Sequence, residues 1–272
     1  MKYIPTTRIT VLNDNLPGDV CGSQHGLSFL VKSDISFLFD AGPSDIILRN
    51  SHILKVNLDD IQLIVISHGH YDHTGGLLFL DRKKLICHPA ALEPKHRKSD
   101  GSWNGLPLPA TEIRKRFRVT ETREPLWLSP NVVFLGEIPR LTGFESTTTA
   151  FMTADGKDDF IPDDSGVAII TSEGLVVISG CAHAGICNIV KHAMKVTGKE
   201  KVFAVMGGFH LKEVDEVTRE TIRCLKEMQV RQVFPSHCTS MEARMAFARE
   251  WTSPIITSGS VISFPSLIIE KD

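Results

Sequence analysis

The chain has 272 residues, 42% of them hydrophobic, and a formal net charge of −2 at pH 7. This near-neutral balance argues against a general binder of nucleic acid or of membrane surfaces, and no apolar run reaches the length of a membrane span. The six cysteines include no C-x-x-C pair and the N-terminus lacks the apolar core of a signal peptide, so we expect reduced thiols and a cytoplasmic protein. No Gly/Ser/Pro-rich linker divides the chain, which predicts a single domain over residues 1–272.

Short apolar runs bounded by Gly, Pro, Asn and Asp recur along the chain and predict strands. In chain order these runs cover residues 8–14, 26–33, 36–42, 61–68, 84–89, 131–136, 166–173, 175–180, 202–208, 232–237 and 259–265. Helical periodicity is found at residues 44–54, 185–198, 214–229 and 240–250. The early strands come in hairpin-like pairs, whereas the later ones alternate with helices. This order predicts an α/β (α+β) protein in which two mixed sheets pack face to face under helices, a four-layer αββα sandwich.

The segment from about Glu93 to Pro130 departs from this pattern, because it contains five prolines and little periodicity. It predicts an irregular loop insertion over residues 93–130, which would form a wall or lid of a site. Within it, Trp103 is a candidate to stack on a flat ring, and Arg116, in a run of basic residues, is a candidate to bind a phosphate. The alternative is an ordinary solvated surface loop.

The apolar run at residues 61–67 leads directly into a group of side chains that bind metals. His68, His70, Asp72 and His73 lie within six residues, with a glycine between the first two where the chain must turn. A loop just past a strand end can aim alternate side chains at one point. Imidazole nitrogens with a carboxylate oxygen form a zinc-type ligand set that iron or manganese also accepts. The spacing therefore predicts a metal site rather than scattered polar loop residues.

The stretch SHGHYDHTGG resembles the His-x-His-x-Asp-His signature of the metallo-β-lactamase superfamily. FLFDAGPS, about thirty residues earlier, resembles the strand and Asp-x-Gly turn that precede the signature there. The resemblance implies the αββα fold and a site for two divalent metal ions. It makes Asp40 either a residue that braces the ligands or a turn aspartate without a metal role. It also implies that His237, in VFPSHCTS, is the final histidine ligand.

Two segments depart from the usual pattern of the superfamily. In LVVISGCAHAG, Cys181 stands where an aspartate normally bridges both metals, and His183 is our choice for the missing histidine ligand. Cys181 is either a thiolate ligand or a small buried residue beneath the site. IPDDSGVAII stands near the place of the usual Gly-His-Thr-x-Gly segment and leaves Asp163 or Asp164 as a candidate oxygen ligand. Five segments resemble one branch of the superfamily, whose members are labelled as similar to dihydropterin–ribofuranosylaminobenzene-phosphate synthase. These segments are QHGLSFLV, GEIPR, GCAHAGICN, MGGFHL and PSHCT.

Two more histidines occur in segments that resemble this branch. His210 follows a predicted strand and two glycines that permit close approach of the backbone to a ligand. We expect it to contact substrate or transfer a proton, with metal binding as the second interpretation. His25 is a candidate substrate contact or an ordinary loop residue. The remaining histidines have no such context: His52, His88, His96 and His192.

The ligand pattern and the resemblance together predict a metal-dependent, hydrolase-type enzyme. Two divalent ions, with zinc as first choice and iron or manganese as alternatives, would share a hydroxide that attacks a phosphoester or related bond. Asp72 and His210 would be the catalytic side chains. The substrate would be an anionic or phosphorylated small molecule, such as a pterin-linked sugar phosphate. The alternatives are a lactone or thioester hydrolase and a non-catalytic metal-binding protein of the same fold.

Overall fold

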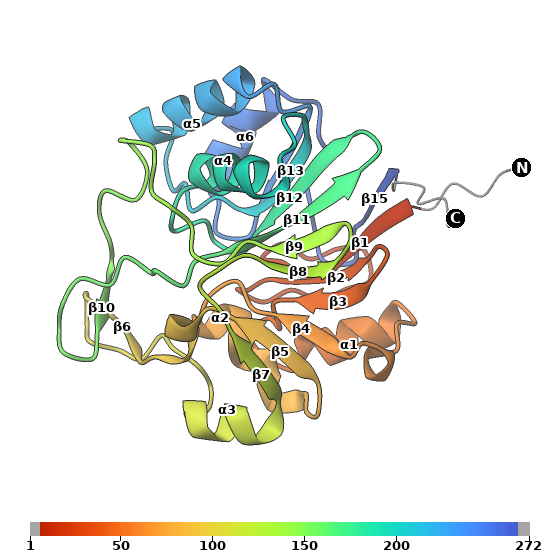
Figure 1. Ribbon diagram of the computed structural model, residues 1–272, viewed down its shortest axis with the longest axis vertical. Coiled ribbons are helices and arrows are strands. Elements are labelled where there is room, and N and C mark those ends of the chain that lie inside the picture. The colour runs from red at the N-terminus through yellow and green to blue at the C-terminus, as the bar shows by residue number, and fades with distance from the viewer. Residues whose placement is uncertain (1–5, 266–272) are drawn as a thin grey trace, which may run out of the picture.

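The computed structural model describes residues 6–265 and contains two large mixed β-sheets that pack face to face (Figure 1). The first sheet has seven strands, in the order β15 (Val261–Pro265), β1 (Thr6–Asn13), β2 (Ser28–Lys32), β3 (Ser36–Phe39), β4 (Leu63–Val65), β5 (Lys84–Cys87) and β7 (Arg118–Glu121). The second has six, in the order β14 (Gln232–Ser236), β13 (Val202–Gly208), β12 (Gly174–Ser179), β11 (Gly166–Thr171), β9 (Val132–Phe134) and β8 (Leu126–Ser129). A separate ribbon pairs β6 (Lys95–Arg97) with β10 (Phe151–Thr153).

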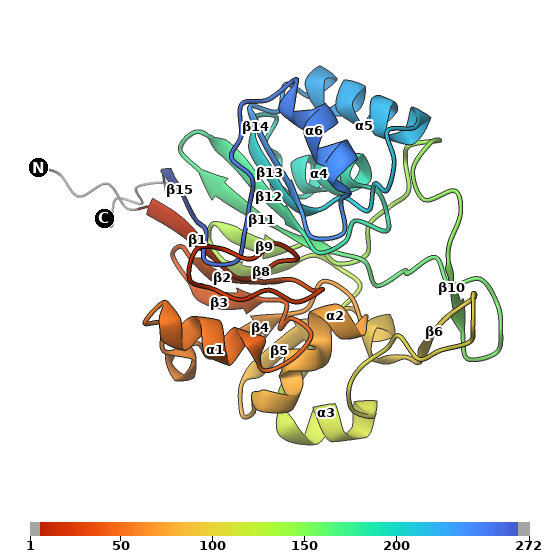
Figure 2. The same cartoon turned by 180° about the vertical axis from the view of Figure 1, so that it is seen from behind.

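Helices cover the outer faces of both sheets, which confirms the predicted αββα sandwich (Figures 1 and 2). On the outer side of the seven-stranded sheet lie α1 (Ile46–Ile53) and α3 (Ala110–Arg116). On the outer side of the six-stranded sheet lie α4 (Ile186–Thr197), α5 (Glu216–Glu227) and α6 (Met241–Ala248). Short helical turns complete the fold: α2 (Tyr71–Thr74), η1 (Leu58–Asp60), η2 (Gly75–Phe79) and η3 (Pro89–Leu92). Within residues 6–265, no helix is both long and apolar enough to cross a lipid bilayer.

The apolar runs of the sequence form strands that are buried on both faces. In β2, Phe29 and Val31 face the opposite sheet, whereas Leu30 packs against the helical layer. In β12, Val176 belongs to the layer between the sheets and Val177 to the layer under the helices. A strand covered on both faces is stabilised by apolar residues at every position. Its sequence is therefore a continuous apolar run rather than an alternation of apolar and polar residues.

Parallel strands bring the polar strand ends of both sheets to one edge of the sandwich. In the seven-stranded sheet β3, β4, β5 and β7 run parallel, and in the six-stranded sheet β12, β13 and β14 do so. The segments that follow β3, β4, β12, β13 and β14 carry Asp40, the histidine-rich loop, Cys181, His210 and His237, respectively. This edge is therefore where the predicted ligands can meet.

The structure corrects the prediction of an irregular loop over residues 93–130. That segment contains β6, α3, β7 and β8, and its last two strands form one edge of each large sheet. Edge strands are partly solvated, and β7 exposes three of its four residues, so they lack the apolar runs that reveal inner strands. The long irregular segment lies between β9 and β11 instead, where β10 is the one strand.

Candidate metal centre

The histidine-rich loop begins just past β4 and continues through α2. The Gly69 N–H donates to Asp163 Oδ2 (2.7 Å) and so fixes the turn between the first two histidines. Gly69 does not adopt a left-handed conformation; instead, a side chain there would collide with the carbonyl oxygen of Ala91. The glycine is therefore required by close packing, not by the conformation of the turn.

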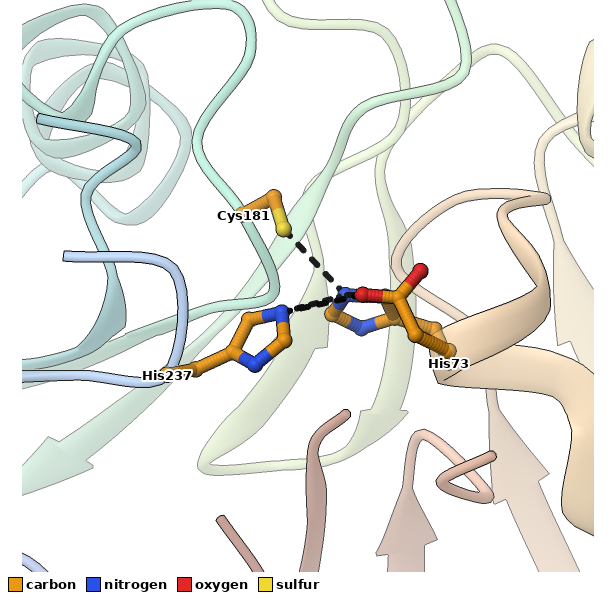
Figure 3. Close-up of side chains that lie close together, drawn as sticks. His73, Cys181 and His237 are labelled. Atoms are coloured by element: carbon orange, nitrogen blue, oxygen red, sulfur yellow. Dashed lines mark hydrogen bonds and ion pairs between the residues drawn. The ribbon is translucent and has the colours of Figure 1, made fainter. Parts of the chain in front are cut away.

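Four buried side chains from the segments after three strands, β4, β12 and β14, form a first group of donors (Figure 3). They are Asp72, His73, Cys181 and His237, and their ligand atoms all lie within 4.8 Å of one another. His73 Nε2 is 3.1 Å from His237 Nε2 and 3.2 Å from Cys181 Sγ. Asp72 Oδ2 is 3.2 Å from His237 Nε2 and 3.5 Å from His73 Nε2. These atoms converge closely enough to hold one ion.

A second group of donors lies beside the first and shares its cysteine. Cys181 Sγ and ring nitrogens of His68 and His183 lie within 4.8 Å of one another. His70 adjoins this group, because its Nδ1 is 2.9 Å from His68 Nε2 and its ring centroid is 4.9 Å from that of His183. The Nε2 atoms of His70 and His183 are buried without a hydrogen-bond partner. The structure thus brings the six predicted ligands together and places Cys181 between two half-sites.

Asp40, at the turn after β3, sets the orientation of two of these rings. Its Oδ2 accepts hydrogen bonds from His73 Nδ1 (2.7 Å) and from the Ser67 hydroxyl (2.7 Å). Because this hydroxyl donates to Asp40, it accepts from His68 Nδ1 at 2.9 Å. Both imidazoles therefore carry a proton on Nδ1 and direct Nε2 into the donor groups. Of the two interpretations of Asp40, the one in which it braces the ligands fits these contacts.

His73 Nε2 and His237 Nε2 face each other, and this arrangement requires a positive charge between them. His237 Nδ1 donates to Asn15 Oδ1 (3.0 Å), so its Nε2 lone pair points at His73 Nε2. Burial lowers the pKa of His73, but the carboxylates of Asp72 and Asp40 outweigh it and raise that pKa to about 9. The position between these rings therefore attracts a proton or a metal cation, and a divalent ion fits it.

The second group consists of imidazoles that burial keeps neutral. Burial lowers the pKa of His68 and of His183 well below the usual value, and neighbouring histidines lower both further. Burial likewise lowers the pKa of His70 to about 3. In the first group, burial would raise the pKa of Asp72, but the two histidines beside it hold that pKa well below its usual range. Metal ligands must be unprotonated, so these three imidazoles and the Asp72 carboxylate are ready to bind a cation.

His237 is held in a left-handed backbone conformation (φ 49°) by contacts to its backbone N–H and carbonyl groups. Its N–H donates to Asp14 Oδ2 (2.9 Å), and its carbonyl accepts from Asn15 Nδ2 (2.9 Å) and Arg244 Nη2 (3.2 Å). Three further strand-end residues of the site have positive φ: Asp40, Ala182 and His210. Such conformations cost about 1–3 kcal/mol each and persist only where the surroundings impose them. Sequence reasoning missed the three residues that hold His237, because their role depends on contacts between distant segments.

A buried ion-pair group connects the histidine-rich loop to the β6–β10 ribbon. Lys95, at the start of β6, is 2% exposed, and its Nζ lies 2.6 Å from Asp163 Oδ1 and 3.4 Å from Asp159 Oδ2. The other oxygen of Asp163 accepts the Gly69 N–H. Asp163 is thus a support of the loop rather than a member of either donor group.

A cavity of about 310 Å³ adjoins the second donor group. His183 and His210, whose ring centroids are 4.4 Å apart, line it together with Phe151 of β10. The Phe151 ring lies 4.3 Å from that of His70, centroid to centroid, so it packs against a donor while lining the cavity. Residues 144–150 form much of the remaining wall. The segment between β9 and β11 therefore supplies the wall that the sequence assigned to residues 93–130.

The structure places two predicted substrate contacts away from this cavity. Trp103 is 52% exposed, donates from Nε1 to the Leu106 carbonyl (3.0 Å) and lines a different cavity. Arg116 donates to the carbonyls of Leu78 and Leu80, both at 2.9 Å, and so joins α3 to η2. Neither residue lines the cavity beside His183, so these positions give no support to the predicted roles, which rested on the residue type and on an assumed loop.

Three other candidates lie close to the donor groups without belonging to them. His25 Nε2 is 3.3 Å from Asp72 Oδ2, and its side chain is 55% exposed. Asp164 Oδ2 accepts from the Ala184 N–H (2.9 Å), which turns its carboxylate toward the backbone. His210 touches the ring of His183, a position suited to the predicted substrate contact.

Donor groups at the ends of parallel strands in an αββα sandwich define the metallo-β-lactamase fold and its metal site. A family model described as the metallo-beta-lactamase superfamily matches residues 22–188, and the chain belongs to this superfamily. A 7,8-dihydropterin-6-methyl-4-(beta-D-ribofuranosyl)-aminobenzene-5'-phosphate synthase of Methanocaldococcus jannaschii is 33% identical and aligns over 89% of this chain and 90% of its own. The crystal structure of Tm1679, described as a metal-dependent hydrolase of the β-lactamase superfamily, is 31% identical, with a TM-score of 0.86 over 96% of this chain and 100% of that one. These matches confirm the resemblance, including the branch of the superfamily.

Proposed function

We propose that the chain is a metal-dependent enzyme that binds two divalent ions, with zinc as the first choice and iron or manganese as alternatives. The observation that carries the proposal is the pair of donor groups that meet at Cys181. One ion would be held by His68, His70 and His183, and the other by Asp72, His73 and His237. With the thiolate of Cys181, each ion would have four protein donors available, the number that zinc prefers.

Two bound divalent ions supply Lewis acidity and activate water. The residues of the chain orient and protect the reacting groups. Asp72 stays ionised and fixed, because its Oδ2 contacts His25, His73 and His237. His210, on the cavity wall, can hydrogen-bond an oxygen of a bound substrate and pass a proton to a leaving group. Phe151 covers the rings of two histidine donors and keeps bulk water from that side.

The substrate that we propose is a small molecule with an aromatic ring and a phosphate group. Support comes from the cavity beside His183, which Phe144, Phe151 and Phe160 line together with the hydroxyl groups of residues 147–149. Aromatic side chains favour flat rings, and hydroxyls can bond to ring substituents. The name of the relative that is 33% identical contains both a pterin ring system and a phosphate.

Protein purified without chelator should contain about two divalent ions per chain. The double variant His68→Ala/His70→Ala should bind about one ion, since it loses two donors of one half-site, and should lose turnover of phosphorylated aromatic compounds. Plasma mass spectrometry measures the metal, and His52→Ala, an exposed histidine on α1, is the matched control. Wild-type protein that takes up no metal even after reconstitution would refute the proposal.

The shared position of Cys181 predicts a thiolate ligand. Burial raises the pKa of its thiol well above the usual value, so a proton would remain on sulfur unless a metal displaced it. Cobalt-substituted wild-type protein should therefore show a near-ultraviolet sulfur-to-cobalt band. Cys181→Ser should lose this band, whereas Cys238→Ser should keep it. Cys181→Asp, which installs the carboxylate usual in the superfamily, should bind both ions without the band. A band that survives in Cys181→Ser would show that the cysteine only packs beneath the site.

A further inference from the structure

Two cavities adjoin the donor groups, and Lys212 lines both of them. The first is the cavity of about 310 Å³ beside His183 and His210. The second has a volume of about 290 Å³ and lies beside His25 and His237. A ligand that extended from one cavity to the other would pass the ammonium group of this lysine.

The Lys212 ammonium is held near the donor groups without being neutralised. Its Nζ donates to the carbonyl oxygen of Cys238 at 3.2 Å, one residue beyond His237. No carboxylate within residues 6–265 forms an ion pair with it. An exposed cation with a single carbonyl contact can bind an anion.

The carboxylates that line the first cavity are already engaged. Glu145 accepts the N–H groups of Cys187 (2.9 Å) and Asn188 (3.0 Å) at the start of α4. Asp215 accepts the N–H of Thr218 (2.9 Å) at the start of α5. Among the described residues, no aspartate or glutamate lines the second cavity. Asp14 lies 3.7 Å from Arg244, and Asp72 contacts His25 and His237, so Lys212 is the cation of this lining without a carboxylate partner among the described residues.

Two arginines, one near the site and one in the basic run, already bind other groups of the protein. Arg244 lines the second cavity, but it is buried, and it donates to the carbonyls of Thr239 and His237. In the basic run after residue 110, Arg114 pairs with Glu121 at 2.8 Å. These contacts leave Lys212 as the basic side chain in position to meet an anionic group of a substrate.

We infer that Lys212 binds the phosphate group of the substrate while the phenylalanine-lined end of the first cavity holds its ring. This inference rests on the proposed function, because it assumes that the substrate reaches the donor groups. The sequence suggested that basic residues at 114–118 bind the phosphate. Lys212, at the junction of the two cavities, takes their place in this inference. A lysine there acts as a point charge for an anion and contributes affinity without taking part in bond cleavage.

The test uses phenylphosphonate, whose carbon–phosphorus bond cannot be hydrolysed as a phosphoester can, as a probe of the zinc-loaded protein by isothermal titration calorimetry. Lys212→Met should weaken its binding about tenfold, the effect of one charge-assisted hydrogen bond, and Lys212→Arg should restore most of the affinity. Lys195→Met is the matched control, since Lys195 is an exposed lysine in the last turn of α4 and should leave affinity unchanged. Phenol, which lacks the phosphonate, should bind equally to wild type and Lys212→Met.

The outcomes separate this inference from the proposed function on which it rests. Unchanged binding of phenylphosphonate by a Lys212→Met variant with full metal content would overturn the inference and leave the metal centre intact. Benzoate is a second probe, with a carboxylate in place of the phosphonate. If Lys212→Met weakens binding of benzoate more than binding of phenylphosphonate, the phosphate assignment is overturned in favour of a carboxylate. Zinc absent from the wild type would count against the proposed function itself, whereas a Lys212 effect in that metal-free protein would still support the anion site.

Discussion

Replacing Lys95 with methionine should lower the free energy of unfolding by about 3–5 kcal/mol, because removing one partner from a buried ion pair leaves the other charge uncompensated. Lys95 is 2% exposed and its main partner, Asp163, is fully buried. Water therefore cannot hydrate the carboxylates beside Lys95 once the lysine is removed. Denaturant unfolding of metal-free protein measures this loss apart from any effect of metal. The same variant should bind zinc more weakly, since Asp163 holds the Gly69 N–H between two ligands.

Lys98→Met is the matched control for this prediction. Lys98 belongs to the same segment, and its ion pair with Asp158 (2.7 Å) is solvated, with side chains 35% and 58% exposed. Exposed pairs contribute about 0.2–1 kcal/mol, so this variant should unfold near the wild-type midpoint and bind zinc normally. Asp163→Asn, which keeps an acceptor for Gly69, should retain more zinc affinity than Asp163→Ala. Equal stability of Lys95→Met and Lys98→Met would show that the buried group does not hold the ribbon in place.

The inner strands and the donor residues could be predicted because their signals are local. An inner strand is apolar along its whole length, as at residues 63–65 and 202–208, and ligands that follow such strands stand out by residue type. His68, His70, Asp72 and His73 were evident from spacing alone. His183 and His237 needed the resemblance to the superfamily, because one histidine after a strand has no distinctive spacing.

The walls and supports of the site could not be predicted, because they depend on contacts between distant segments. Phe151 and residues 144–150 lie in a polar, irregular stretch whose role appears only once β10 pairs with β6. From the sequence, Lys95 would be a surface residue in a basic run. In the structure it is buried, because two aspartates more than sixty residues away compensate its charge. Trp103 is the opposite case. It lies in a segment that the sequence predicted to form a wall of the site, but in the structure it is exposed and lines a different cavity.

Asp40→Asn should weaken zinc binding by about 10–100-fold, the usual effect of losing a residue that orients metal ligands. The Asp40 carboxylate accepts three hydrogen bonds, from the Ser67 N–H, the Ser67 hydroxyl and His73 Nδ1, each at 2.7 Å. An asparagine has one oxygen, so its amide N–H₂ would face at least one of these donors. His73 could then relieve the clash by moving its proton to Nε2, which removes the lone pair that must bind metal. Competition with a chromophoric chelator measures the affinity.

The matched control is Asp45→Asn, which removes a carboxylate just before α1. Asp45 pairs with Arg49 at 2.7 Å, and the two side chains are 34% and 66% exposed, so this change should leave zinc affinity unaltered. Stability measured on both metal-free variants separates loss of fold from loss of ligand orientation. If Asp40→Asn is folded and binds two ions with wild-type affinity, then packing of the imidazole rings alone fixes their orientation. If affinity falls while the metal-free fold persists, the Asp40 hydrogen bonds are what point Nε2 of His68 and His73 at the ions.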